Sequence, residues 1–162
     1  MGNLSGRTAI VTGSARRIGK AIALALAEQG AQLVINARAS AGEADATAKE
    51  IVQKGGKAIA CVADVRKPED VKRLIGAAVK AFGGVDILVN NAAIRPQSAF
   101  FDMTYEKWRD VTATILDGAF LCALEAGPHL AKSKHGRIIC ISGTSAFRGN
   151  KGRIHVMAAK IG

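Results

Sequence analysis

Residues 8–20 constrain the fold of this chain most strongly, because they combine three structural signals in order. Residues 8–12 form a short apolar run typical of a buried strand, and residues 13–16 read as a tight turn. From Arg17 onward, apolar residues recur at helical spacing until Gly30 ends the helix. A helix that opens directly after a strand turns its unpaired N–H groups and its positive end toward one space. The segment therefore predicts an anion-binding turn.

The glycines of this turn match the usual dinucleotide fingerprint only in part. That fingerprint has three glycines in the order G-x-G-x-x-G, whereas this segment has Gly13 and Gly19 alone, at wider spacing. Because a glycine near a strand end is common in α/β proteins, a plain structural turn is the alternative interpretation. The residues at the other strand ends help to decide between an anion-binding turn and a plain structural turn.

Strand and helix patterns alternate along the chain. The predicted strands cover residues 7–12, 32–36, 57–62, 86–90 and 137–142, and the predicted helices cover 17–29, 42–54, 68–82 and 105–130. The last helix is expected to be irregular near Gly118 and Gly127. The strands are continuous apolar runs, as a parallel sheet covered on both faces requires. The alternation predicts one domain over residues 1–162, a Rossmann-type doubly wound α/β fold with helices on both faces.

The predicted sheet is unfinished at its fifth strand. A further helix begins near Arg153 and the sequence ends at Gly162, which leaves the fifth strand as a bare edge. We therefore expect a domain that is incomplete at its carboxyl end and lacks the strands that would follow.

The chain carries a net charge of +10, which raises the question of a nucleic-acid partner. The basic residues are spread along the chain, with no basic run interleaved with aromatic residues, so no nucleic-acid binding is expected. No acidic residue follows Glu125, while lysines and arginines continue to the end. This pattern indicates either a solvated basic face or a partial chain whose acidic partners lie in a missing part.

Other features argue against a membrane protein and a disulfide-linked protein. Asp117 and Glu125 interrupt the longest apolar stretch and the N-terminus lacks an apolar signal run, so we predict a cytoplasmic protein without a membrane partner. Cys61, Cys122 and Cys140 are odd in number and lie in separate apolar segments. They are expected to be buried free thiols, and no metal site is predicted.

Glycine and polar residues follow every predicted strand. They are Gly13, then Asn36-Ala37-Arg38, then Asp64, then Asn90-Asn91-Ala92-Ala93, and finally Ser142-Gly143-Thr144-Ser145. In an open α/β sheet, ligands bind outside the carboxyl ends of the strands, near the switch in strand order. This shared location predicts a nucleotide cleft.

The residues after the second strand indicate which nucleotide binds. An NAD site usually has an acid there for the ribose hydroxyls, whereas this chain has Ala37 followed by Arg38. A guanidinium matches a 2′-phosphate by charge and geometry, and Arg16 could reach the same group, so NADP is predicted over NAD. The alternative is that both arginines are merely solvated. Asp64 either accepts from the adenine amino group or caps the helix that starts near Pro68.

Three motifs, in this order and spacing, resemble a known family. They are Thr12-Gly13 with Ile18-Gly19, Asp64-Val65, and Asn90-Asn91-Ala92-Ala93. From about Arg7 to its end, the chain resembles the short-chain dehydrogenase/reductase family. The resemblance implies an NAD(P)-binding Rossmann-type fold, a homo-oligomer (tetramer or dimer), and hydride transfer between a nicotinamide and a carbonyl or alcohol substrate. The family normally has two more strands and a substrate loop after this point.

The resemblance also implies which residues contact the cofactor. The pyrophosphate side would be held by Gly13, Ser14, Arg16, Arg17, Ile18 and Gly19, the 2′-phosphate by Arg38, the adenine by Asp64 and Val65, the adenosine ribose region by Asn90 and Ala92, and the nicotinamide ribose by Lys160. Arg17 departs from the family pattern, which has a glycine there. Pteridine-reductase-like members share the arginine.

The catalytic positions depart further from the family pattern. The family's tyrosine, serine and asparagine positions fall on Val156, Gly143 and Ile115. Only Lys160 is in its expected place. His155, five residues before it, lies about 100° from the tyrosine direction on a helix. Ser142 and His155 are the candidate substitutes, Ser142 to polarise an oxygen and His155 as an acid. The alternatives are a strand-end hydroxyl that caps the turn and a surface histidine.

Two functions follow from these residues. The first is an NADP-dependent oxidoreductase of this family with an altered acid. The second is an NADP(H)-binding sensor or assembly subunit that lacks the tyrosine. General acid–base catalysis contributes on the order of 10²–10⁴-fold, so its loss slows hydride transfer without abolishing it. The enzyme is the preferred interpretation.

Overall fold

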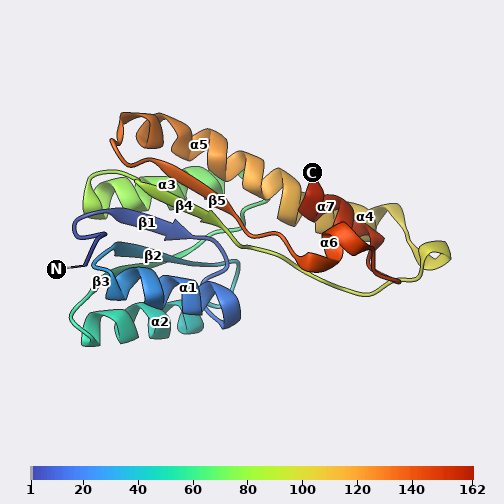
Figure 1. The fold of residues 1–162 in the computed structure, drawn as a ribbon, viewed down its shortest axis with the longest axis horizontal. Helices are drawn as coiled ribbons and strands as arrows, with labels where there is room; N and C mark the ends of the chain where they lie inside the picture. Colours follow the sequence, from blue (N-terminus) through green and yellow to red (C-terminus); the bar gives the residue numbers. More distant parts are fainter. Residues whose placement is uncertain (1) are drawn as a thin grey trace.

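The computed structural model describes residues 2–162 and contains one parallel sheet. Its strands are β1 (Thr8–Val11), β2 (Gln32–Ala37), β3 (Lys57–Val62), β4 (Ile87–Asn90) and β5 (Arg137–Cys140). Their order across the sheet is β3-β2-β1-β4-β5, and every neighbouring pair is parallel (Figure 1). The strands added after β1 extend the sheet in one direction to β3, and β4 and β5 extend it in the other. The switch point of this doubly wound sheet therefore lies between β1 and β4. The predicted Rossmann-type fold is confirmed.

Helices cover both faces of the sheet (Figure 1). They are α1 (Arg17–Glu28), α2 (Ala41–Gln53), α3 (Pro68–Phe82), α4 (Tyr105–Thr112), α5 (Gly118–Lys132), α6 (Thr144–Arg148) and α7 (Ile154–Ile161), with a 3₁₀ turn η1 (Phe100–Asp102) and a π-helical segment η2 (Ala113–Asp117). The α1 and α2 helices pack on one face, and α3 and α5 pack on the other.

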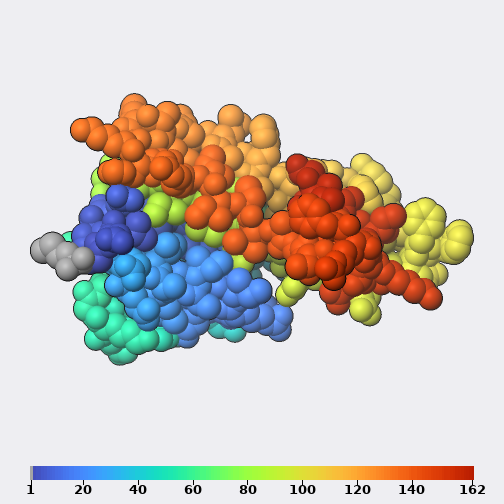
Figure 2. All heavy atoms as spheres, in the orientation of Figure 1, coloured from blue at the N-terminus to red at the C-terminus, as the bar shows by residue number. Residues whose placement is uncertain are grey.

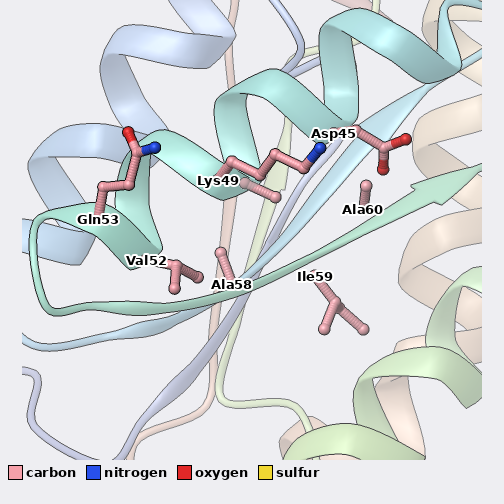
Figure 3. A pocket seen from close by; sticks show the side chains of 8 residues that line it. Asp45, Lys49, Val52, Gln53, Ala58, Ile59 and Ala60 are labelled. Carbon is pink, nitrogen blue, oxygen red and sulfur yellow. The ribbon is translucent and has the colours of Figure 1, made fainter.

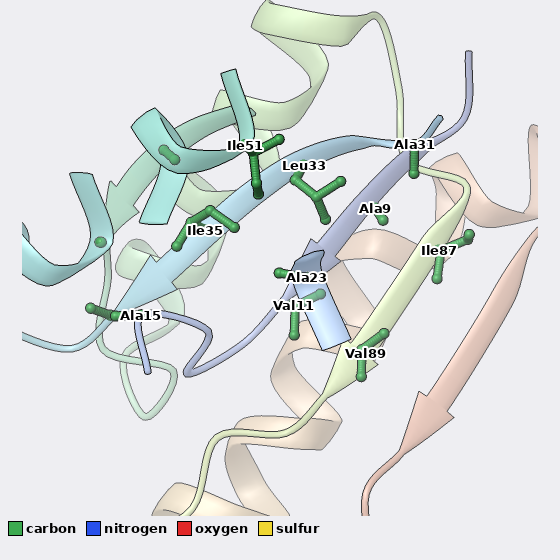
Figure 4. Close-up of a cluster of buried hydrophobic side chains, with 13 residues drawn as sticks. Ala9, Val11, Ala15, Ala23, Ala31, Leu33, Ile35, Ile51, Ile87 and Val89 are labelled. Atoms are coloured by element: carbon green, nitrogen blue, oxygen red, sulfur yellow. The ribbon is translucent and has the colours of Figure 1, made fainter. Parts of the chain in front are cut away.

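Successive residues of the central strand enter two different cores, because strand side chains alternate between faces. Ala9 and Val11 pack with Leu33 on the α1–α2 side (Figure 4), whereas Ile10 packs with Leu88 on the α3–α5 side. All five of these side chains are fully buried. This double burial explains the continuous apolar runs in the sequence.

The predicted helix over residues 105–130 runs as three segments, α4, η2 and α5. The irregularity expected near Gly118 is confirmed, because the π-helical segment ends there, whereas α5 continues through Gly127. An added Cβ at Gly118 would lie 2.8 Å from Val65 Cγ2, so this helix approaches the loop after β3 too closely for a side chain.

By length and composition, the combined run Tyr105–Lys132 could cross a membrane. Within the fold, 39% of its most apolar window is buried. Cys122, Ala126 and Leu130 join the core that α3 shares with the sheet. This packing is that of a core helix of an α/β domain.

Strand β5 forms an exposed edge, as predicted from the sequence. Cys140 on this strand is exposed, and Cys61 on the opposite edge strand β3 is half-buried. The predicted burial of all three thiols is therefore correct only for Cys122. An edge strand has a neighbour on one side only, so an apolar run at the edge does not guarantee burial.

The α4, α6 and α7 helices pack together beyond the carboxyl ends of the strands. In Figure 2 their atoms form a separate lobe of yellow and red spheres at one end of the molecule. This lobe brings residues that follow β5 next to residues that follow β4.

Candidate functional site

A cleft of about 1030 Å³ opens at the carboxyl ends of all five strands. Most of the predicted site residues line it, namely Gly13, Arg16, Arg17, Ile18, Gly19, Arg38, Asp64, Val65, Ala92, Ser142 and Lys160. A second hollow of about 380 Å³ lies between α2 and β3 and contains none of the predicted residues (Figure 3). The strand-end cleft is therefore the candidate site.

The turn after β1 holds the N-terminus of α1 against the strand ends. Gly13 has a φ of +64°, and its N–H donates to Asn36 Oδ1 at 3.0 Å. A Cβ at Gly19 would lie 2.3 Å from the Gly13 carbonyl oxygen, so the turn and the helix are in backbone contact. No side chain within residues 2–162 caps the first turn of α1. Its N–H groups are therefore free to bind an anion.

Arg17 has a φ of +52°, which makes it the one non-glycine residue of the described chain with a left-handed backbone. Glycine adopts this conformation at little cost, which explains why the family has a glycine here. Its neighbour Arg16 lies 3.7 Å from the Glu43 carboxylate, and both side chains are largely exposed. An exposed pair at this distance holds Arg16 only weakly, so it can turn into the cleft.

Ser14 does not line the cleft. Its side chain is fully buried, and its Oγ accepts a hydrogen bond from the Asn36 N–H at 2.9 Å. The hydroxyl is thus engaged with β2, and the expected contact of Ser14 with the pyrophosphate side stays a prediction. Ser14 and Asn36 together fix the shape of the turn.

Arg38 follows β2 and reaches the cleft without a fixed partner. It forms no ion pair and no side-chain hydrogen bond with any residue from 2 to 162. Its charge helps to lower the pKa of Asp64. An unpaired guanidinium at this strand end is available for a ligand anion.

Asp64 is held by Arg66 and does not cap α3. Arg66 Nη2 donates to Asp64 Oδ2 at 2.6 Å, and Arg66 Nε donates to both carboxylate oxygens at 3.0 Å. These hydrogen bonds are the main cause that lowers the pKa of Asp64. The capping interpretation is wrong, since no side chain of residues 2–162 caps α3. Sequence reasoning missed Arg66, although a carboxylate and a guanidinium two residues apart after a strand were a visible signal.

The two asparagines after β4 point in different directions. Asn90 Nδ2 donates to the Ala119 carbonyl at 3.3 Å, so this side chain is directed to α5 and does not line the cleft. The expected place of Asn90 beside a ribose stays a prediction, and its side chain does not support it. Asn91 lines the cleft and donates to the carbonyls of Thr12 and Gly13 at 2.8 and 3.1 Å. This side chain ties the ends of β4 and β1 together.

Lys160 and Ser142 both line the cleft. Ser142 Oγ donates to the Lys160 carbonyl at 3.1 Å, and Lys160 Nζ donates to the Ile141 carbonyl. Burial, followed by the nearby charge of Arg95, lowers the pKa of Lys160. These two hydrogen bonds tie the end of α7 to the residues that follow β5.

The two positions to which the family resemblance assigns an asparagine and a tyrosine hold apolar residues of one buried cluster. Ile115 and Val156 are buried in one cluster with Val111 and Ala159, where α7 meets α4 and η2. Neither side chain has a proton to give. The cluster therefore offers no proton donor at the positions predicted for the asparagine and the tyrosine.

His155 does not lie at the surface and does not line the cleft. Its side chain is fully buried, and within residues 2–162 neither ring nitrogen has a hydrogen-bond partner. The expectation of a surface histidine is wrong, because α7 packs against α4 on this side. The imidazole is therefore not positioned to give a proton to a ligand in the cleft.

Acidification from about pH 7.5 to about pH 5.5 is expected to destabilise the fold through His155. Burial, with a smaller effect from the charge of Lys107, lowers the pKa of His155 below its ordinary value of 6.5. Below that value the unfolded chain binds a proton that the folded chain does not, so stability present above it is lost as the pH falls. Urea unfolding at the two pH values measures this loss.

The matched variants are His155→Leu and His135→Gln. The leucine variant should lose less stability on acidification than the parent protein, and His135→Gln, a change at an exposed position, is the control. An unchanged decline in His155→Leu would show that another group causes it.

The strand order and the strand-end cleft define a Rossmann-type α/β protein. Residues 7–162 match the family model described as short chain dehydrogenase. The chain belongs to the short-chain dehydrogenase/reductase family, which is a family of oxidoreductases.

Known proteins of this type share much of the sequence. The chain is 41% identical over 159 residues to a 3-oxoacyl-[acyl-carrier-protein] reductase of Synechocystis, covering 98% of this chain and 64% of that protein. A dehydrogenase/reductase of Sinorhizobium meliloti 1021 has a TM-score of 0.93 and 36% identity, covering 98% of this chain and 62% of that one. A short chain dehydrogenase of Mycobacterium avium has a TM-score of 0.92 and 36% identity, covering 99% of this chain and 60% of that one. The chain thus spans less than two thirds of the length of these relatives.

Proposed function

We propose that this chain is an NADP-dependent oxidoreductase that transfers a hydride between a nicotinamide and a small carbonyl or alcohol substrate. The observation that carries this proposal is one cleft shared by the uncapped N-terminus of α1, the unpaired Arg38 and the paired Lys160 and Ser142. The relatives named 3-oxoacyl-[acyl-carrier-protein] reductase support a carbonyl substrate. NAD is the less favoured cofactor, since no acid follows β2.

The residues of the cleft fit such a cofactor by their donor chemistry. The turn from Gly13 to Gly19, with the side chains of Arg16 and Arg17, would hold the pyrophosphate. Arg38 would hold the 2′-phosphate, and Asp64 and Val65 would border the adenine. Ala92 would lie against the adenosine ribose region and Lys160 against the nicotinamide ribose. The bound nicotinamide supplies the hydride.

Within residues 2–162, this site lacks an evident proton donor for the substrate oxygen. Ser142 Oγ would polarise the substrate oxygen beside the Lys160 ammonium, while Ile115 and Val156 supply no proton. General acid catalysis is worth on the order of 10²–10⁴-fold, so we expect slow turnover. NADPH binding without oxidation across a panel of carbonyl compounds would indicate a sensor or assembly subunit instead.

Arg38→Asp tests the cofactor assignment. NADPH affinity is expected to fall about 10- to 100-fold, because a charge-assisted hydrogen bond contributes about 1.5–3 kcal/mol, whereas NADH affinity should change little. Fluorescence titration of both cofactors measures this difference. Arg148→Asp is the matched control, since Arg148 is exposed and lies outside the cleft. Equal affinity of the parent protein for the two cofactors would rule out the NADP assignment.

We also propose that the protein forms a homo-oligomer, a tetramer or a dimer, and acts in the cytoplasm. Leu116, Phe120 and Leu124 recur at four-residue spacing from η2 into α5, and their exposed fractions are 37%, 62% and 62%. A stripe of exposed apolar side chains on one helix face supports self-association. No metal, membrane or nucleic-acid partner forms part of this proposal.

A further inference from the structure

Two arginines of the cleft are not assigned to any part of the cofactor in the function proposed above. Arg95 follows the asparagines after β4, and Arg153 immediately precedes α7; both line the cleft. Neither forms an ion pair or a side-chain hydrogen bond within the described part of the chain. The Nε atom of Arg153 is buried and has no hydrogen-bond partner among residues 2–162. A buried donor without a partner costs free energy, so a ligand acceptor would stabilise it.

The acidic residues of the cleft are already paired elsewhere. Glu43 contacts Arg16, while Asp64 and Asp110 both bind Arg66. These three carboxylates are the acidic side chains that line the cleft in residues 2–162. No carboxylate there is left to neutralise Arg95 and Arg153, so the positive charge at this end is available to a ligand.

These arginines lie at the opposite end of the cleft from Arg38. Arg38 follows β2, whereas Arg95 follows β4 and Arg153 directly precedes α7, the helix that carries Lys160; β1 separates β2 from β4. The 2′-phosphate assigned to Arg38 is therefore not the anion for this pair. Ser142, assigned to the reacting oxygen, and Lys160, whose pKa is lowered by burial and by the nearby charge of Arg95, belong to the same end of the cleft.

We propose that Arg95 and Arg153 bind an anionic group of the substrate, a carboxylate or a phosphate, while its carbonyl faces Ser142 and Lys160. The inference rests on the proposed function and names its substrate class. Guanidinium groups bind carboxylate and phosphate by paired N–H donors, and such charge-assisted bonds are roughly twice as strong as neutral ones. The substrate is thus an oxo acid or an oxo phosphate rather than a neutral ketone.

Calorimetric titration of the protein, with and without saturating NADP⁺, tests this inference. The probes are acetoacetate for a carboxylate, inorganic phosphate for a phosphate, and ethyl acetoacetate as the neutral counterpart. At least one anion should bind, and the ester should bind at least about 10-fold more weakly than acetoacetate if the carboxylate is recognised. Preference for phosphate over acetoacetate would identify the oxo phosphate.

Arg95→Gln and Arg153→Gln should each weaken binding of the preferred anion by about 10- to 100-fold. Arg148→Gln and Lys151→Gln remove exposed cations outside the cleft and should change nothing. Thermal unfolding of every variant confirms that it folds. NADPH affinity is measured in the same variants and should be unchanged, which separates substrate binding from cofactor binding.

The outcomes distinguish this inference from the proposed function. Failure of both anions to bind the parent protein, or unchanged anion binding in both arginine variants, overturns the inference even when NADPH binds. A parent protein that binds the anion through these arginines but binds neither nicotinamide cofactor supports the inference as an anion site and overturns the proposed function.

Discussion

Gly19→Ala is expected to lower the free energy of unfolding by about 3 kcal/mol. The added Cβ would lie 2.3 Å from the Gly13 carbonyl oxygen, 2.6 Å from Asn91 Nδ2 and 2.9 Å from Ser14 Cα. Two of these contacts are with backbone atoms, so α1 can relieve them only by moving away from the turn. The same movement would open the proposed pyrophosphate site. Urea unfolding and NADPH titration measure the two effects.

Gly76→Ala is the matched control, because the same change there meets open space. Gly76 lies within α3, and an added Cβ has no heavy atom within 4 Å. Helix propensity alone then predicts a gain of about 0.5–1 kcal/mol. If Gly19→Ala were as stable as the parent protein, the close contact between α1 and the turn would not hold in solution.

Ile115→Asn combined with Val156→Tyr is expected to raise the rate of NADPH oxidation by about 10²–10⁴-fold. Val156 lies four residues before Lys160 on α7 and packs with Ile115. The double change would place a phenol and an amide where the family has them, and the shorter asparagine would leave room for the larger ring. Steady-state rates with acetoacetate and ethyl acetoacetate measure the gain.

Ile115→Asn combined with Val156→Phe distinguishes the effect of the phenol proton on the rate from the effect of the added ring. This control adds the same aromatic ring without the hydroxyl, so its rate should remain near that of the parent protein. Equal rates in the tyrosine and phenylalanine variants would show that the phenol does not act as the acid. Thermal unfolding of both variants tests whether the cluster around Val111 tolerates the ring.

Local patterns in the sequence predicted the secondary structure and the location of the site. Apolar runs and helical spacing depend on neighbours within about one or two turns, so the strands and the break before Gly118 were recognisable. Parallel strands place their carboxyl ends at one edge, which is why Gly13, Arg38 and Ser142 could be assigned to one cleft.

The direction of individual side chains could not be predicted in the same way. Asn90 and Asn91 are identical in type and adjacent, yet one turns to α5 and the other to the cleft. His155 looked like a surface residue at a helix start, and it is fully buried. In both cases the decisive neighbour lies far away in the chain, on α5 or on α4.

The sequence by itself determined an alternating α/β chain, a glycine turn and a row of candidate site residues at the strand ends, because these depend on short-range patterns. Only the tertiary structure decided that Arg95 and Arg153 line one cleft in which each carboxylate pairs with another arginine. It likewise decided that Ile115 and Val156 form a hydrophobic contact. These features arise from packing between residues about 40 to 60 positions apart, which no local pattern encodes.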